Sequence, residues 1–356
     1  MYSINAADKL IYHYDRVYEL LKTGKTNPVH ITVGLTNYCN HACTWCYIDF
    51  IREEHKKPIN ADIRKMLEVL QEAHDMGVKA VTLVGDGEPS IHPEFAVFVR
   101  GLKKIGLDCG IFTNGGWKKP EVTDALLETM TFVRFSIDAA TEKTHKLLHR
   151  ADDFEKVIAN CTELVKRRNS TGTRMPTIGV QFVVNSNNID EVADAAKMFR
   201  KTGVDYIALK PTYVNVLNEN HSEKPLDPAE VKTRLDEVAQ LATADFKVLW
   251  KQWQFDTLVF SPEQSRSYDV CRAVWLSPYI DEDGNVEFCG NLKGRGFTIG
   301  NVYKDSFSSI WGGTQHMEAL KKIELDKCPA GCKLHGLNVK LNEICCYTNE
   351  RHENFI

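Results

Sequence analysis

The sequence predicts an α/β fold in which parallel strands alternate with helices, followed by a smaller cysteine-rich unit. Between residues 29 and 211, six apolar strand-like segments are separated by amphipathic helical segments. Such alternation is typical of parallel strands joined by right-handed crossovers. Beyond residue 270, two short β-segments flank Asp283-Gly284, a dipeptide typical of tight hairpins. The alternation alone leaves open whether the strands form an open sheet or a barrel.

The first element is a helix over residues 7–21, where Leu10, Tyr14, Val17 and Leu21 recur at helical spacing. A strand over 29–35 follows. The later elements are a helix around 63–73, a strand over 78–84, a helix over 93–105, a strand over 108–113, a helix from 121, a strand over 132–137, a helix from 153, a strand over 177–184, a helix from 189, a strand over 206–209, a helix from 227 and a helix over 306–323.

Length and charge restrict the class of protein. A chain of 356 residues is long enough for about two domains. Its 44 basic and 48 acidic side chains are spread along the chain, so we expect no nucleic acid partner. No stretch approaches the ~20 apolar residues that span a bilayer, and the N-terminus has no signal-peptide pattern. We therefore expect a cytoplasmic protein without a membrane partner.

Three cysteines, Cys39, Cys43 and Cys46, lie within eight residues directly after the first predicted strand. Thiolates at this spacing on an irregular loop suit a metal centre, and in a [4Fe–4S] cluster they would leave one iron open for a ligand that is not protein. A zinc site is the alternative, because zinc also favours thiolates. The chain has eleven cysteines in all, and a reducing cytosol favours metal binding over disulfides.

This loop, with Trp45 before the last cysteine, resembles the C-x3-C-x-aromatic-C hallmark of the radical S-adenosylmethionine (radical SAM) superfamily. The resemblance implies a partial (β/α)6 barrel over about 29–211, with the amino and carboxylate groups of SAM on the open iron. It also implies that an external reductant, such as flavodoxin or ferredoxin, drives cleavage of SAM to a 5′-deoxyadenosyl radical. That radical would abstract hydrogen from the substrate.

Further SAM contacts are expected at the carboxyl ends of the strands, where parallel α/β folds place their sites. The turn Gly85-Asp86-Gly87-Glu88-Pro89 leaves backbone groups free to bind a charged ligand. It resembles the family's GGEP motif, with Asp86 in place of a glycine. Asn185 could face the adenosine or the substrate. By the resemblance, the cofactor contacts are Trp45, Gly85, Gly87, Glu88, Pro89, Asn114, Ser136, Arg150 and Gln181.

Two cysteines on the predicted hairpin, Cys271 and Cys289, and two on a later tight loop, Cys328 and Cys332, make a possible four-ligand site. Such a site leaves no iron open, so its natural role is electron transfer or structure. Zinc is again the alternative. With Gly284, the hairpin cysteines match the first half of the pattern of the SPASM/Twitch extension of radical SAM enzymes.

The full SPASM pattern has more cysteines than this chain provides, which favours the shorter Twitch type with one auxiliary [4Fe–4S] cluster. Cys345 and Cys346 could be a substitute ligand, a hydrogen donor or structural. Cys109 and Cys161 lie in a predicted strand and helix, and we expect both in the core. The expected domains are an N-terminal helix (1–28), a radical SAM core (29–240), a linker (241–270) and the auxiliary cluster domain (271–356).

We expect the substrate to be a small polar metabolite, such as an amino sugar, an aminocyclitol or a nucleoside sugar. Only about 28 residues precede the first predicted strand, and peptide-modifying relatives usually have a leader-recognition domain there. A two-electron oxidation fits an auxiliary cluster that accepts an electron. The alternatives are an epimerase or another radical transformation of such a sugar, a peptide-modifying maturase, and a non-enzymatic electron carrier.

Overall fold

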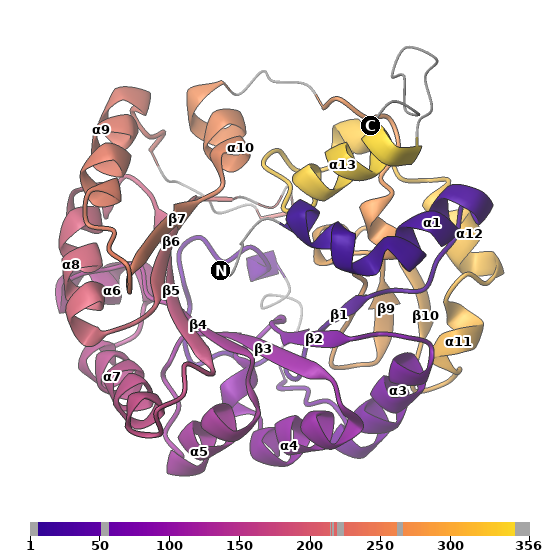
Figure 1. The fold of residues 1–356 in the computed structure, drawn as a ribbon, viewed down its shortest axis with the longest axis horizontal. Coiled ribbons are helices and arrows are strands. Elements are labelled where there is room, and N and C mark those ends of the chain that lie inside the picture. Colours follow the sequence, from indigo (N-terminus) through magenta and orange to yellow (C-terminus); the bar gives the residue numbers. More distant parts are fainter. Residues whose placement is uncertain are drawn as a thin grey trace.

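The computed structural model of the chain describes residues 6–50, 57–213, 215, 217–218, 224–261 and 266–345. Its centre is a curved ten-stranded sheet with helices on its outer side (Figure 1). Eight adjacent strands are parallel, and β9 and β10 continue antiparallel from β8. The strands in chain order are β1 (His30–Val33), β2 (Ala80–Leu83), β3 (Asp108–Thr113), β4 (Phe132–Ser136), β5 (Thr177–Val184), β6 (Tyr206–Pro211), β7 (Lys247–Trp250), β8 (Tyr279–Ile280), β9 (Asn285–Glu287) and β10 (Thr298–Asn301).

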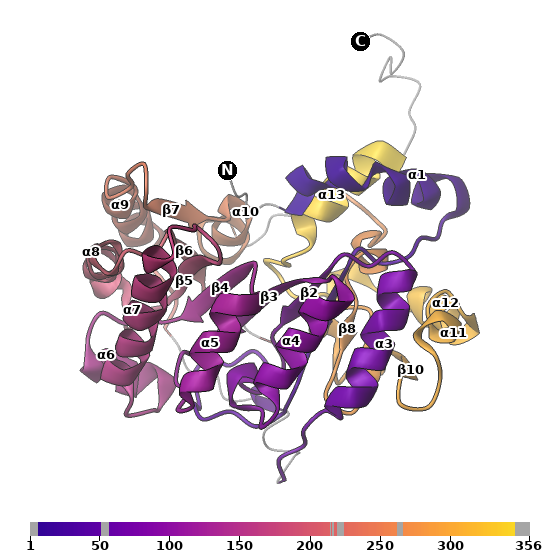
Figure 2. The ribbon, with the colours of Figure 1, turned by 60° about the horizontal axis from the view of Figure 1, so that its bottom comes forward.

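Helices between the parallel strands form the outer layer of the barrel (Figure 1). They are α3 (Ile63–Asp75), α4 (Phe95–Ile105), α5 (Pro120–Thr129), α6 (Glu142–His149), α7 (Phe154–Ser170), α8 (Val192–Thr202) and α9 (Pro228–Ala239). The 3-10 helix η1 (Ala6–His13) and α1 (Tyr14–Thr23) pack against α13, near the amino end of β1 (Figure 2). The C-terminal part contains α10 (Gln252–Phe255), α11 (Phe307–Ile310), α12 (Thr314–Leu320) and α13 (His335–Cys345).

The strands separate the helix-facing core from the barrel interior. Alternate side chains such as Ile31, Val133 and Leu209 are fully buried under the helices. Because side chains alternate along a strand, the intervening ones face the interior. There the Arg134 Nε donates to the Tyr206 hydroxyl at 2.8 Å, passing over Gly179 on the strand between them. A Cβ at Gly179 would lie 2.1 Å from the Tyr206 ring, so only glycine leaves this space.

The predicted α/β class with a C-terminal unit is confirmed, but the sheet is longer than expected. The expected linker 241–270 contains β7, which pairs with β6, and β8 pairs with β1 in parallel. β7, with four residues, is too short for its pattern to stand out in the sequence. β8 is the first strand of the predicted hairpin, but its pairing with β1 was not predicted. Helix α6 was not predicted because its sequence is mostly polar. The predicted helix 306–323 is two helices, because Gly312-Gly313 interrupts it.

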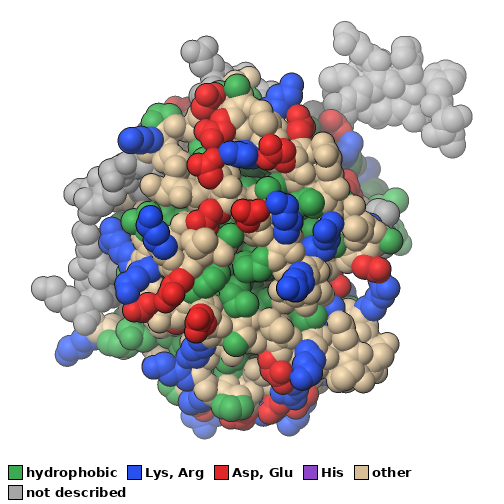
Figure 3. All heavy atoms as spheres, turned by 90° about the vertical axis from the view of Figure 1, so that its left-hand side faces the viewer, with side chains coloured by type: hydrophobic (Ala, Val, Ile, Leu, Met, Phe, Trp, Pro, Cys, Tyr) green, Lys and Arg blue, Asp and Glu red, His purple; other side chains and the backbone are tan. Residues whose placement is uncertain are grey.

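The surface shows no large field of a single charge on the side that contains α8 and α9. There, Lys and Arg side chains are interspersed with Asp and Glu (Figure 3). A nucleic acid interface would require clustered basic residues. None of the described helices is both long enough and apolar enough to cross a bilayer.

A buried charged cluster joins the barrel to the C-terminal hairpin. Lys293 forms ion pairs with Asp86, which follows β2, and with Asp281, at 3.0 Å. The Tyr279 hydroxyl donates to Asp86 at 3.0 Å. Beside them, the Glu282 side chain is 2% exposed, and its Oε2 has no hydrogen-bond partner among the described residues. Burial, together with the Asp86 charge, raises the pKa of Glu282 to about 9.

This raised pKa predicts that stability falls as pH rises. The folded protein keeps the Glu282 proton up to about pH 9, whereas the unfolded chain loses it near 4.5. Between these values the folded state binds more protons, so unfolding becomes easier as pH increases. In Glu282→Gln we expect the free energy of unfolding to depend less on pH. Relative to the parent, the variant should gain about 1–3 kcal/mol in the free energy of unfolding between pH 5.5 and pH 8.5. Urea denaturation at both pH values measures this, with the exposed Glu318→Gln as control. If the free energy of unfolding changed equally with pH in Glu282→Gln and in the parent, the prediction would be wrong.

Candidate functional site

The cysteine loop follows β1 and is held by backbone hydrogen bonds to two neighbouring segments. The end of α6 accepts two of them, from Ala42 N to His149 O at 3.0 Å and from Thr44 N to Leu148 O at 2.9 Å. On the other side, Glu88 N donates to Tyr38 O at 2.9 Å. The loop is therefore fixed between α6 and the turn after β2.

Gly87 is the point of closest approach between that turn and the loop. A Cβ at Gly87 would lie 2.0 Å from Tyr38 O and 2.7 Å from Thr36 O. These neighbours are backbone atoms, so they cannot move aside as a flexible side chain would. The glycine of the predicted motif therefore lets the turn after β2 contact the cysteine loop.

Glu88 connects the ends of β2 and β3. Its carboxylate accepts hydrogen bonds from Ser90 N at 3.0 Å, Thr113 Oγ1 at 2.6 Å and Asn114 N at 2.7 Å. The Asn114 side chain donates to Asn40 Oδ1 at 2.9 Å. The structure thus gives the Glu88 side chain a supporting role, and places Asn114, which follows β3, beside the loop.

A buried histidine cluster that the sequence analysis missed lies behind the loop. His149 Nδ1 is 3.3 Å from both Cys43 Sγ and His41 Nδ1. His41 and His145 bond the two carboxylate oxygens of Asp153, at 3.1 and 3.0 Å. Burial alone would raise the pKa of Asp153, but these two bonds lower it well below its usual value. The spacing of His145 and His149, one helical turn apart, is the signal that could have revealed this cluster.

The other predicted contacts are placed as follows. Trp45 is buried against Leu148 and Val183, with its ring centre 5.2 Å from that of His149. Arg150 ends α6 in a left-handed conformation (φ 50°) and is exposed, without a hydrogen bond or ion pair to any described residue. Trp45 thus packs the loop in place, while nothing in the described chain holds the Arg150 side chain.

Ser136 and Gln181 are neighbours across β4 and β5 and face the barrel interior. Gln181 Oε1 has no hydrogen-bond partner among the described residues, and the same holds for Asn185 Nδ2. Buried polar atoms without partners are rare, so these amides are suited to bind a ligand.

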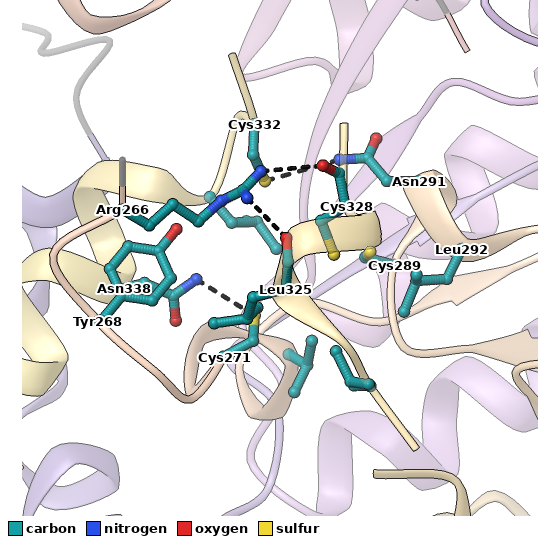
Figure 4. A pocket seen from close by; sticks show the side chains of 13 residues that line it. Arg266, Tyr268, Cys271, Cys289, Asn291, Leu292, Leu325, Cys328, Cys332 and Asn338 are labelled. Atoms are coloured by element: carbon teal, nitrogen blue, oxygen red, sulfur yellow. Dashed lines mark hydrogen bonds between the residues drawn. The ribbon is translucent and has the colours of Figure 1, made fainter. Parts of the chain in front are cut away.

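The second cysteine group lines one cavity in the C-terminal part (Figure 4). Asn338 Nδ2 points at Cys271 Sγ at 3.2 Å, and Asn291 Nδ2 at Cys332 Sγ at 3.7 Å. Burial raises the pKa of Cys271 to about 12, so without a metal this thiol keeps its proton. The four thiols that line the cavity are those of Cys271, Cys289, Cys328 and Cys332.

Arg266 lines this cavity and holds one of its loops in place. Its guanidinium donates to three backbone carbonyls, Leu325 O at 2.6 Å, Cys328 O at 3.0 Å and Pro329 O at 2.8 Å. These bonds hold the loop that presents Cys328 and Cys332. Sequence analysis did not find Arg266, because its partners are backbone atoms some sixty residues away.

The spacing of the thiols distinguishes a cluster from a single ion. Four thiolates on one zinc ion, each at about 2.3 Å, have sulfurs about 3.8 Å apart. In the described chain, the groups of three or more potential ligands within 4.8 Å of one another are His41–Cys43–His149 and His41–His145–Asp153. Neither cysteine set forms such a group. Neither set is therefore preformed as a site for a single ion.

Two stacked tyrosines lie near both cysteine sets. Tyr47 directly follows Cys46, and its ring stacks on that of Tyr213 with centres 4.9 Å apart. Burial raises the pKa of Tyr47, and the nearby thiols of Cys289 and Cys332 raise it further. The stack therefore adjoins the end of the loop and lies near two thiols of the cavity.

A parallel α/β barrel with a three-cysteine loop after its first strand and a four-cysteine cavity in its C-terminal part defines an iron–sulfur enzyme. The family model of the radical SAM superfamily matches residues 33–182, and that of the SPASM iron–sulfur cluster-binding domain matches residues 271–333. A protein of Pyrococcus furiosus, the tungsten-containing aldehyde ferredoxin oxidoreductase cofactor-modifying protein, is 30% identical over 339 residues, which span 90% of this chain and 92% of that protein. The chain belongs to the radical SAM superfamily and contains a SPASM domain.

More distant relatives share this organisation. The subtilosin biosynthesis protein AlbA of Bacillus subtilis is 24% identical over 87% of this chain and 68% of its own length. The structure of SuiB from Streptococcus suis with S-adenosylmethionine has a TM-score of 0.68 at 17% identity, over 89% of this chain and 74% of that one. The structure of anSMEcpe with bound AdoMet has a TM-score of 0.61 at 17% identity, and the match covers 87% of this chain and 84% of that one. The protein is thus a radical SAM enzyme with a SAM-binding [4Fe–4S] cluster and auxiliary iron–sulfur chemistry.

Gly87→Ala tests the close contact between the turn and the loop. Since the added methyl group would displace backbone, we expect a loss of about 1–3 kcal/mol in stability and weaker SAM binding. Denaturant unfolding and equilibrium dialysis with SAM measure these effects. Gly290→Ala is the control, because its Cβ would meet nothing within 4 Å. SAM binding at parental strength in Gly87→Ala would contradict the prediction.

A variant with Cys39, Cys43 and Cys46 all replaced by Ala tests the loop as a cluster site. Anaerobic reconstitution of the parent should give about eight irons per chain, and this variant should lose about half of them and all SAM cleavage. Iron analysis and chromatography of 5′-deoxyadenosine measure both. Cys109→Ala, in the buried core, should keep the parental iron content. SAM cleavage by the triple variant would show that the cluster assignment is wrong.

Proposed function

We propose that Cys39, Cys43 and Cys46 hold the SAM-binding cluster and that Cys271, Cys289, Cys328 and Cys332 hold one auxiliary cluster. The enzyme then carries out a two-electron oxidation of a small-molecule substrate in the barrel interior. When bound, the first cluster and SAM supply a 5′-deoxyadenosyl radical that removes a hydrogen atom, and the auxiliary cluster supplies an electron acceptor. The position of the Tyr47–Tyr213 stack, next to Cys46 and near the thiols of Cys289 and Cys332, is the observation that supports this reaction.

The residues of the chain provide position and electrostatics for this chemistry. Asn114 Nδ2, 3.8 Å from Cys39 Sγ, and His149, 3.3 Å from Cys43 Sγ, orient the loop thiols. The Gly85–Pro89 turn offers backbone groups to the amino end of SAM, and the unpartnered amide of Gln181 faces the adjacent interior. Asn338 and Asn291 supply the corresponding N–H donors at the auxiliary site.

The cysteine count supports a single auxiliary cluster. Of eleven cysteines, seven belong to the two sets. Cys109 and Cys161 are each 1% exposed in the apolar core, which excludes them as ligands. Only Cys345 and Cys346 remain, too few for a further four-cysteine site, and Cys346 lies outside the described residues. Cys345 ends α13, which packs on η1 and α1, so its position gives no support to the hydrogen donor that an epimerase needs.

Peptide maturation is the second candidate. AlbA and the sporulation killing factor maturation protein SkfB of Bacillus subtilis, each 24% identical, are named for peptide products. The Pyrococcus furiosus relative, named for modifying a cofactor, is more similar and favours a small molecule. No relative named above supports the expected amino sugar, aminocyclitol or nucleoside sugar by its name. The proposed reductant is flavodoxin or ferredoxin, and we propose that the enzyme acts in the cytoplasm.

Loss of the auxiliary site should separate SAM cleavage from substrate oxidation. With dithionite and SAM, we expect the parent to release 5′-deoxyadenosine slowly, and faster with its substrate, which is sought among candidate metabolites and peptides. In Cys271→Ala or Cys289→Ala the cleavage should persist while oxidised product is lost, because the acceptor is missing. Cys161→Ala is the control.

Two results would contradict this proposal. Absence of 5′-deoxyadenosine from the reduced, reconstituted parent would exclude the proposed enzyme. An isomer of the substrate that contains solvent deuterium would show epimerisation instead of oxidation.

A further inference from the structure

Two lysines lie side by side on the interior face of β6 and β7. Lys210 is on the same face of β6 as Tyr206, whose hydroxyl accepts a hydrogen bond inside the barrel. The register pairs Leu209 with Trp250, so Lys251, the next residue of its segment, lies opposite Lys210. Parallel strands present their carboxyl ends to the site, and both lysines are at that end.

Neither lysine is paired with an acid in the part of the chain that the structure describes. Among the described residues, neither ammonium forms a hydrogen bond or an ion pair. Burial and the charge of Arg134 lower the pKa of Lys210, and the same two causes lower that of Lys251 to about 8. Asp138, the acid that acts on Lys210, already accepts a hydrogen bond from Val183 N and lies 3.2 Å from His149 Nε2.

The polar groups around the two lysines do not neutralise their charges. Two of these groups are side-chain amides, and one is another cation. Gln181 Oε1, on the adjacent β5, has no partner among the described residues. The same holds for Nδ2 of Asn185, which directly follows β5 and is 1% exposed. Arg134 stacks over the Phe112 ring at 4.7 Å and adds a third positive charge. A part-buried cluster of cations in which neither lysine has an ion-pair partner among the described residues costs folding free energy, so this arrangement is suited to an anion brought by a ligand.

We propose that Lys210 and Lys251 bind an anionic group, a phosphate or a carboxylate, of a small-molecule substrate. The proposal rests on the proposed function, because it assigns the substrate class of the same site. SAM is expected at the open iron beside the Gly85–Pro89 turn, after β2, whereas the lysines are on β6 and after β7. The substrate's anion is held on this side, and the group to be oxidised extends toward the Tyr47–Tyr213 stack.

Calorimetric titration of the reconstituted, SAM-loaded protein with inorganic pyrophosphate and with malonate tests the inference. The parent should bind at least one of these anions, and binding should weaken with added salt. In Lys210→Met and in Lys251→Met the affinity should fall at least about tenfold, since each loses a charge-assisted contact. Comparison of the two anions distinguishes a phosphate from a carboxylate.

Lys247→Met is the matched control. Lys247 is on β7, four residues before Lys251, but its Nζ donates to Thr243 O at 3.1 Å and is exposed. It should bind anions and cleave SAM like the parent. Because methionine keeps the length of the stem without the charge, the Lys210 and Lys251 variants should melt at or above the parental temperature, which shows that they fold.

The outcomes separate the two proposals. If the parent binds neither anion, or if both lysine variants bind as tightly as the parent, the anion site is wrong, even when SAM cleavage is normal. If the parent binds anions through these lysines but forms no 5′-deoxyadenosine, the proposed function fails and the anion site stands.

Discussion

The backbone contact between the cysteine loop and the turn after β2 is the constraint on which the site depends. An irregular loop cannot satisfy its own polar groups, so neighbouring segments must accept and donate its hydrogen bonds. Gly87 allows the two backbones to meet, and the end of α6 holds the other side of the loop. The position of the three thiols is therefore determined by tertiary contacts with residues 50 to 110 positions away.

This dependence explains which parts of the site the sequence could reveal. The cysteine spacing and the glycine turn are local patterns, and both were found. The role of Glu88 was not, because its three hydrogen-bond donors come from its own turn and from the end of the next strand. Lys210 and Lys251 are forty-one positions apart and become neighbours only through the register of β6 and β7.

The same reasoning applies to the fold. Strands with long apolar runs, such as β5, are buried on one face whatever their partners, so their sequences identify them. In contrast, β7 begins with Lys247 and is followed by Lys251, and all four of its residues are partly exposed. It is a strand because β6 offers it a free edge, and that edge is visible only in three dimensions. The extension of the sheet by β8 has the same cause.

The C-terminal part of the chain neutralises the charge of Asp86, a residue at which the barrel departs from the family motif. Asp86 stands where the family motif has a glycine, and it adds a buried negative charge to the turn after β2. The structure directs its carboxylate to Lys293 and the Tyr279 hydroxyl, both supplied by the C-terminal segment. Lys293 is four residues beyond Cys289, and Asn291 between them contacts Cys332. The segment that neutralises Asp86 in the turn after β2 is thus the one that shapes the four-cysteine cavity. A change at either place is transmitted to the other through one buried ion pair, which costs several kcal/mol if one partner is left alone.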